Sequence, residues 1–112
     1  MKQLFAIPLE NGRLCSHFGH CQQFSIIEVE NNAIVGEALV TPPPHEPGLL
    51  PGWLAERGVT EVIAGGMGQR ALNLFAMQNI KVNVGAQHKD PKELVNDWLQ
   101  NALVTGSNAC DH

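Results

Sequence analysis

Apolar runs separated by turn residues divide the first part of the chain into three strands. Residues 3–8 form a largely apolar run, which predicts a short buried strand. Residues 23–30 and 33–40 alternate in part between apolar and polar positions, and they flank Asn31-Asn32. Because Asn tolerates a positive φ, that pair favours a tight turn, and the two runs predict an antiparallel hairpin.

The second half of the chain alternates apolar strands with helical patterns. The run at 60–64 predicts a strand that is apolar on both faces, as in a parallel sheet, and the run at 80–84 predicts one further strand. Helices are predicted from near Pro51 to near Gly58 and again after the glycine-rich residues 65–68. The second of these helices carries its apolar side chains on one face, namely Ala71, Leu72, Phe75 and Ala76.

The last predicted helix has the clearest start signal. Asp90 is a good cap, Pro91 suits the first helical position and Glu93 suits the third. The apolar positions that follow repeat at helical spacing and predict one buried face, formed by Leu94, Val95, Trp98, Leu99 and Ala102.

This order of elements (β-β-β-α-β-α-β-α) predicts an α/β fold: a mixed five-stranded sheet with helices on its faces. The length of 112 residues fits one domain, which we place at residues 1–104. Residues 105–112 show no periodicity and predict a flexible tail that contains Cys110 and His112.

Charge and composition exclude several classes of protein. The formal net charge is −4 and the seven basic residues are scattered, so we expect no binding of duplex nucleic acid. With four Phe, two Trp and no Tyr, the chain also offers few side chains on which single-stranded bases could stack. No apolar run is long enough to cross a bilayer or to serve as a signal peptide.

These observations lead us to expect a cytoplasmic chain without membrane contact. Thiols stay reduced in the cytoplasm, so the three cysteines are interpreted as thiols or metal ligands before disulfides. Of the three, Cys15 fits a small buried residue best.

The expected strand directions bring most of the candidate chemistry to one edge of the sheet. If the strand at 23–30 runs antiparallel to the other four strands, its amino end lies at the same edge of the sheet as their carboxyl ends. Open α/β sheets bind ligands at such an edge. The side chains and the loop expected there are His17, His20, Cys21, His45, the loop 65–68 and His88.

The densest group is the segment 16–21, Ser-His-Phe-Gly-His-Cys. Imidazole and thiolate are the usual protein ligands of soft and borderline metals, so His17, Cys21 and His20 are candidate metal ligands. Their spacing matches no zinc-finger pattern, and a surface loop that happens to contain histidine remains the alternative. His45 lies in a proline-rich loop on the same edge, and the tail residues Cys110 and His112 could reach it.

A second candidate lies where the strand at 60–64 meets the following helix. Gly65, Gly66, Met67 and Gly68 could present backbone N–H groups to a phosphate or to the sulfide face of a cluster. They match neither the dinucleotide fingerprint nor the phosphate-binding loop. The alternative is that the glycines allow close packing of helix on strand and that Met67 belongs to the core.

The residues favour binding over catalysis. A metal-dependent nuclease needs several converging carboxylates, yet Asp90, Asp97 and Asp111 all fall in the last quarter of the chain. On the expected edge only Glu46 is acidic. A nuclease or a phosphate-binding enzyme is therefore disfavoured, and a module for zinc or nickel is the main alternative to a cluster-binding protein.

Three segments together resemble one family. The segment 16–21 followed by Phe24 is similar to the His-Phe-Gly signature of the dinitrogenase iron-molybdenum cofactor biosynthesis family. Residues 62–71, Val-Ile-Ala-Gly-Gly-Met-Gly-Gln-Arg-Ala, resemble its second signature, and residues 81–86 resemble its last strand. The match covers nearly the whole chain in the family's order, as in small single-domain members.

The resemblance implies a ribonuclease-H-like fold without nuclease activity. It also implies a non-catalytic carrier of an iron–sulfur or molybdenum-containing cluster, with His17 as the first ligand carried over and Cys21 as the second. The implied partners are proteins that assemble or accept metalloclusters. The sequence leaves the oligomeric state open between a monomer and a homodimer.

Overall fold

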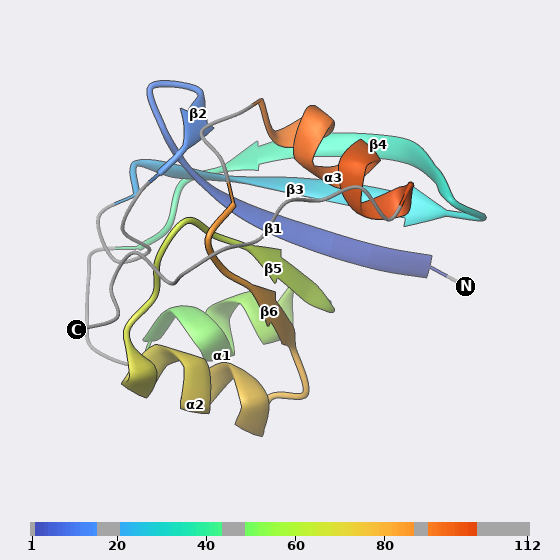
Figure 1. The fold of residues 1–112 in the computed structure, drawn as a ribbon. Coiled ribbons are helices and arrows are strands. Elements are labelled where there is room, and N and C mark those ends of the chain that lie inside the picture. Colours follow the sequence, from blue (N-terminus) through green and yellow to red (C-terminus); the bar gives the residue numbers. More distant parts are fainter. Residues whose placement is uncertain (1, 16–20, 44–48, 87–89, 101–112) are drawn as a thin grey trace.

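The computed structural model describes residues 2–15, 21–43, 49–86 and 90–100. In these residues a mixed sheet lies between helices on its two faces (Figure 1). The elements are β1 (Lys2–Glu10), β2 (Arg13–Leu14), β3 (Gln23–Glu30), β4 (Ala33–Val40), α1 (Leu49–Glu56), β5 (Glu61–Ile63), α2 (Gln69–Met77), β6 (Lys81–Asn83) and α3 (Pro91–Leu99).

The strand order of the sheet is β4-β3-β1-β5-β6. β3 pairs antiparallel with both β1 and β4, whereas β1 with β5 and β5 with β6 pair in parallel. Strand β3 therefore runs against the other four, and the strand directions expected from the sequence are confirmed. All five expected strands and all three expected helices are present.

The sheet also has a sixth strand that the sequence did not predict. Asn11 and Gly12 both have positive φ, 54° and 82°, and form a tight turn after β1. The turn folds β2 back onto β1, where Leu14 pairs with Leu9 in antiparallel register. The segment expected to be a loop up to residue 20 therefore begins as a short hairpin, so the prediction of five strands was one strand short.

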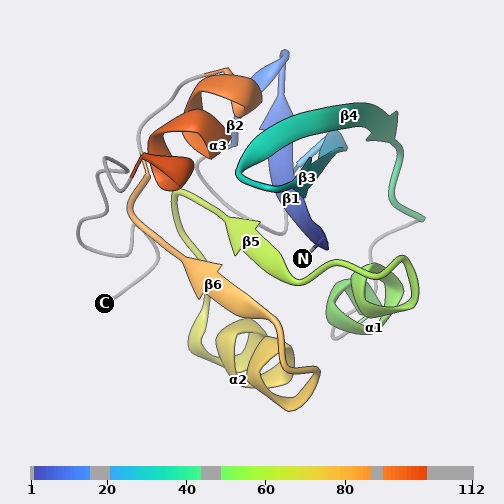
Figure 2. The same cartoon turned by 90° about the vertical axis from the view of Figure 1, so that its right-hand side faces the viewer.

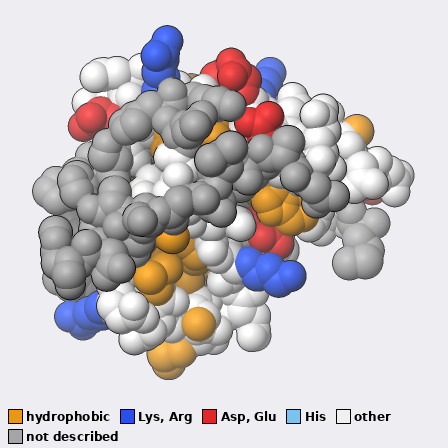
Figure 3. Space-filling model, in the orientation of Figure 1, with side chains coloured by type: hydrophobic (Ala, Val, Ile, Leu, Met, Phe, Trp, Pro, Cys, Tyr) orange, Lys and Arg blue, Asp and Glu red, His pale blue; other side chains and the backbone are white. Residues whose placement is uncertain are grey.

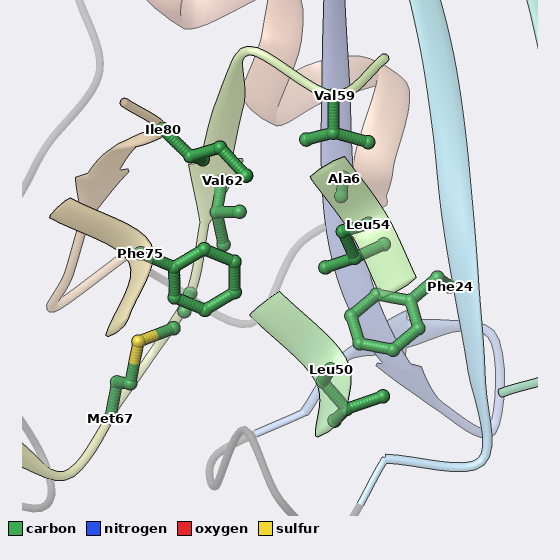
Figure 4. Close-up of a cluster of buried hydrophobic side chains, with 10 residues drawn as sticks. Ala6, Phe24, Leu50, Leu54, Val59, Val62, Met67, Phe75 and Ile80 are labelled. Carbon is green, nitrogen blue, oxygen red and sulfur yellow. The ribbon is translucent and has the colours of Figure 1, made fainter. Parts of the chain in front are cut away.

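The two faces of the sheet carry two separate clusters of buried side chains. α1 and α2 cover one face and α3 covers the other (Figure 2). Consecutive residues of a strand point to opposite faces, so Ala6 joins one cluster while Phe5 and Ile7 join the other. The α1/α2-side cluster, most of which Figure 4 shows, consists of Ala6, Phe24, Leu50, Leu54, Val59, Val62, Ala64, Met67, Phe75 and Ile80.

The α3-side cluster takes the opposite residues of the same strands. Within it, Phe5 meets Trp98 of α3 edge to face, with ring centroids 4.9 Å apart and an interplanar angle of 73°. Trp98 and Leu99 pack against the cluster as the helical stripe predicted, and Asp90 with Pro91 starts α3 as expected. The cluster consists of Phe5, Ile7, Leu9, Leu14, Ile27, Val29, Ile63, Ala86, Leu94 and Val95.

Two polar side chains are buried among the described residues. Ser25 is satisfied because its hydroxyl donates to Glu37 Oε2 at 3.2 Å. Glu61 lies beside Lys81 in the β5–β6 register. Burial raises the pKa of the Glu61 carboxyl above its ordinary value, and the nearby Lys81 charge offsets part of that rise.

Gly58 ends α1 in the left-handed conformation, with φ at 83° and its amide donating to the carbonyl of Ala55 at 3.0 Å. A Cβ at this position would lie 3.3 Å from Leu4 Cδ1, whereas a Cβ on Gly52 within α1 would meet nothing within 4 Å. We expect Gly58→Ala to lower the free energy of unfolding by about 1–2 kcal/mol. The matched variant Gly52→Ala should raise it by about 0.5–1 kcal/mol.

Urea denaturation of both glycine variants beside the wild type measures these two shifts. A Gly58→Ala variant as stable as the wild type would contradict the left-handed helix end, whatever Gly52→Ala does.

Among the described residues, no helix is long and apolar enough to cross a membrane.

Candidate functional site

The end of β1 holds both flanks of the segment 16–20. The amide of Cys15 donates to the carbonyl of Pro8 at 2.8 Å, and the amide of Gln22 donates to the carbonyl of Leu9 at 2.8 Å. Although the segment itself lies outside the described residues, its two ends are therefore attached to neighbouring residues of one central strand. This end of β1 is the carboxyl edge of the sheet on which the sequence placed the candidate chemistry.

The ends of β5 and β6 complete the described part of this edge. The amide of Ala64 donates to the carbonyl of Asn83 at 2.8 Å, and the amide of Gly85 donates to the carbonyl of Gly65 at 3.0 Å. Parallel pairing thus continues beyond both strands. The glycine loop consequently begins from a backbone that the neighbouring strand holds in place.

Within the glycine loop the four residues have different surroundings. Gly65 and Gly66 are buried, whereas Gly68 is exposed and caps α2 with an extended backbone, φ −66° and ψ 156°. Met67 is 1% exposed and lies beside Phe75 in the α1/α2-side cluster (Figure 4). Packing in the core therefore accounts for the side chain of Met67. This is one of the two roles that the sequence left open for it. The backbone N–H groups of the loop remain candidates for contact with an anion.

Cys21 is half-buried at the beginning of β3 and packs against the α1/α2-side cluster. The pKa of its thiol is raised to about 12, first by burial and then by the nearby Cys15 thiol, while a backbone hydrogen bond offsets part of the rise. At neutral pH the thiol is consequently protonated. A metal that binds Cys21 must displace this proton, and the positive charge of the metal supplies the driving force.

Cys15 is the second cysteine that the structure describes. It is 3% exposed, which fits the expectation of a small buried residue, but it lies at the same strand end as Cys21 and interacts with it electrostatically. The structure forms no disulfide between Cys15 and Cys21.

The remaining candidate ligands lie outside the described residues, namely His17, His20, His45, His88, Cys110 and His112. Within the described residues, no group of three or more His, Cys, Asp or Glu side chains is placed to hold a metal ion. The described part of the edge therefore contributes two thiols and the backbone of the glycine loop.

Basic side chains do not gather into a patch on the described surface of the face in Figure 3, where they stand apart from one another. One of the chain's arginines, Arg57, has its guanidinium 4.4 Å from the centre of the Trp53 ring, a cation–π contact on α1. On this face the structure agrees with the scattered basic residues of the sequence.

Comparison with solved structures confirms the fold. The crystal structure of PH0822 has a TM-score of 0.88 at 23% identity and covers 100% of both chains. A candidate dinitrogenase from Methanocaldococcus jannaschii has a TM-score of 0.76 at 14% identity, covering 96% of this chain and 98% of that chain. The apo form of the orange protein from Desulfovibrio gigas has a TM-score of 0.76 at 19% identity, covering 95% and 94%.

Sequence comparison goes further than the fold. An uncharacterized protein of Methanocaldococcus jannaschii is 33% identical over 82 residues, which cover 69% of this chain and 70% of that protein. The sequence profile of the family described as dinitrogenase iron-molybdenum cofactor matches residues 1–101, which contain both signatures quoted above. This chain therefore belongs to the dinitrogenase iron-molybdenum cofactor family.

Proposed function

We propose that this protein is a non-catalytic carrier for an iron–sulfur or molybdenum-containing metal–sulfur cluster. The observation that carries the proposal is the position of Cys21: a half-buried thiol at a fixed strand end, directly after the His-Phe-Gly-His segment, in a member of this family. Soft metals and metal–sulfur clusters take thiolate and imidazole ligands. The cargo would come from a protein that assembles metalloclusters and pass to one that accepts them.

The protonated state of Cys21 suits a carrier better than a permanent metal site. Because burial raises the pKa of this thiol to about 12, a proton competes strongly with the cargo for the sulfur. Competition weakens the bond to the metal and provides a route for release, in which the sulfur takes up a proton as the cargo leaves. The backbone around the thiol stays fixed during exchange, because the neighbouring Gln22 is hydrogen-bonded to β1.

The proposed ligand set begins with His17 and Cys21. His20 and His45 are further candidates, and Cys110 and His112 could join from a flexible tail at 105–112, beyond a single carrier domain at 1–104. Backbone N–H groups of the loop 65–68 could contact sulfide of the bound cluster. The chain would work in the cytoplasm, where its thiols stay reduced, as a monomer or a homodimer.

The described residues at the carboxyl edge favour binding over hydrolysis. The buried carboxylate of Glu61 lies at the beginning of β5, which is the opposite edge of the sheet, and Asp97 lies on α3. A nuclease requires carboxylates that converge on a metal ion. The chemistry available at the described part of this edge is ligation through sulfur and backbone groups.

Anaerobic reconstitution with iron and sulfide, with and without molybdate, tests the carrier function. We expect the wild type to gain visible absorption and to retain both metal and sulfide, and His17→Ala and Cys21→Ala to retain less than about half as much per chain. The exposed α3 variant Asn96→Ala serves as the matched control and should load as the wild type does. Binding of zinc or nickel without sulfide, or no uptake by the wild type, would contradict the proposal.

A further inference from the structure

The tip of the β1–β2 hairpin is an Asn-Gly turn. Asn11 and Gly12 are both exposed, and so are Glu10 and Arg13 on either side of them (Figure 1). A Cβ at Gly12 would meet none of the described residues within 4 Å. Solvent therefore reaches the peptide bond between Asn11 and Gly12.

The amide nitrogen of Gly12 is available to react with the Asn11 side chain. Among the described residues it donates no backbone hydrogen bond, whereas the amide of Asn11 donates to Gln22 Oε1 at 3.2 Å. Gly12 also lacks a side chain that would hinder the approach of its nitrogen to the neighbouring carboxamide. Because β2 is only two residues long, this end of the hairpin can open locally and let the turn rotate into a reactive geometry.

We propose that Asn11 is a site of spontaneous deamidation, with water as the co-reactant. The Gly12 nitrogen forms a bond to Cγ of Asn11, the bond from Cγ to Nδ2 breaks, and ammonia leaves with the proton of the Gly12 amide. Water then opens the cyclic imide at either of its carbonyls, with no change of oxidation state. The product at position 11 is an aspartate or an isoaspartate. This modification goes beyond the carrier function and does not depend on it.

Asn79 provides a comparison within the same chain. Its φ of 60° is close to the 54° of Asn11, and it too is exposed. It is followed by Ile80, whose amide donates to the carbonyl of Phe75 at 3.0 Å and whose side chain is branched at Cβ. We expect Asn11 to deamidate at least about tenfold faster than Asn79, because the hydrogen bond and the branched neighbour both raise the barrier at Asn79.

An isoaspartate at position 11 would disturb the end of β1 that holds the segment 16–20. It adds one methylene to the backbone of the turn, so Leu9 and Leu14 could no longer pair in their present register. The next residue is Cys15, whose amide bond to the Pro8 carbonyl holds one flank of that segment. Hydrogen exchange at the Cys15 amide should therefore be faster in the deamidated protein than in fresh protein.

Ageing of the full-length protein in mildly alkaline buffer, followed by digestion and mass spectrometry, tests the proposal. Trypsin releases Asn11 in the peptide 3–13, where it is the only asparagine, and Asn79 in the peptide 71–81. We expect the peptide 3–13 to change with time from the amide to the acid mass, and a protein-isoaspartate methyltransferase to label it. The matched variant Asn11→Gly tolerates the positive φ and has no carboxamide, so its peptide should stay unlabelled.

Three results would overturn the proposal. The first is a peptide 3–13 that stays unchanged in the folded protein while the same peptide reacts in the chain unfolded in urea. The second is equal deamidation at Asn11 and Asn79, since Gly12 would then have no special part. The third is labelling of the Asn11→Gly variant at the wild-type level. Unaltered hydrogen exchange at Cys15 after deamidation would overturn the effect on the segment 16–20.

Discussion

Replacing Phe24 with alanine is expected to lower the free energy of unfolding by about 3–5 kcal/mol. The side chain is fully buried in the α1/α2-side cluster, and its ring lies 6.0 Å from that of Trp53 on α1. Truncation removes its apolar surface from the core and leaves a cavity that the paired strands β1, β3 and β4 can close only in part. Because the free energy of unfolding of a small domain is about 5–15 kcal/mol in total, this loss is a large fraction of it.

Urea denaturation followed by tryptophan fluorescence measures the loss, and Leu39→Ala on β4 is the matched control. Leu39 is 60% exposed at the edge of the sheet, so its truncation should change the free energy of unfolding by less than about 0.5 kcal/mol. Similar shifts in the two variants would contradict the arrangement of Phe24 between sheet and helix.

Phe24 also links the core to the candidate site. It follows Cys21 by three residues and pairs with Val40 across β3 and β4. Both Phe24 and Cys21 contact the α1/α2-side cluster, so loss of the ring removes packing on which the thiol depends. A Phe24→Ala variant that still folds should therefore bind cargo less well, although this phenylalanine is no ligand.

The sequence predicted those elements whose pattern is long enough to repeat. β3 and β4 have the expected bounds, because partial alternation over eight residues each and two Asn residues at positive φ, Asn31 and Asn32, specify a hairpin. The strand predicted at 60–64 has regular pairing only over Glu61–Ile63. The apolar pattern reports burial, and burial continues into Ala64 and the glycine loop after the regular strand ends.

The sequence could not predict β2, since two residues cannot show a period. The pairing of Leu14 with Leu9 directs Leu14 into the α3-side cluster. Cys15, which follows it, is buried as its residue type led us to expect. Strand register is a property of two segments and not of either one alone.

Met67 shows the opposite case. Its position in a signature made contact with a cluster plausible, and its residue type made core packing plausible. The structure supplies a packing partner in Phe75, so the hydrophobic effect accounts for the side chain. The sequence was compatible with both contact to a cluster and core packing, and it did not distinguish between them.

Cys21 in the metal-free protein is expected to react with iodoacetamide roughly a thousandfold more slowly at pH 8 than an ordinary cysteine. The reason is the small fraction of thiolate. Burial and the Cys15 thiol raise the pKa of Cys21 from 9.0 to about 12. The rate should rise about tenfold per pH unit well beyond pH 9, where an ordinary thiol levels off.

Mass spectrometry of the alkylated peptides measures the rate at Cys21, and the same chain unfolded in urea is the control. Fragment masses separate Cys21 from Cys15, which shares its tryptic peptide between Arg13 and Arg57. The unfolded chain should react at the ordinary rate. Rapid alkylation in the folded chain would mean that Cys21 is a ready thiolate, and the proton-controlled release proposed for the carrier would then lack its physical basis.

The raised pKa of the Cys21 thiol also makes the free energy of unfolding depend on pH. Because the folded-state pKa of Cys21 lies above the ordinary value, its contribution to the free energy of unfolding is fully present below about pH 9 and is lost as pH rises toward about 12. Metal acts in the opposite direction, since a bound cation stabilises the thiolate that burial disfavours. Cargo should therefore restore at alkaline pH the stability that the empty chain loses there, and loading should become tighter as pH rises.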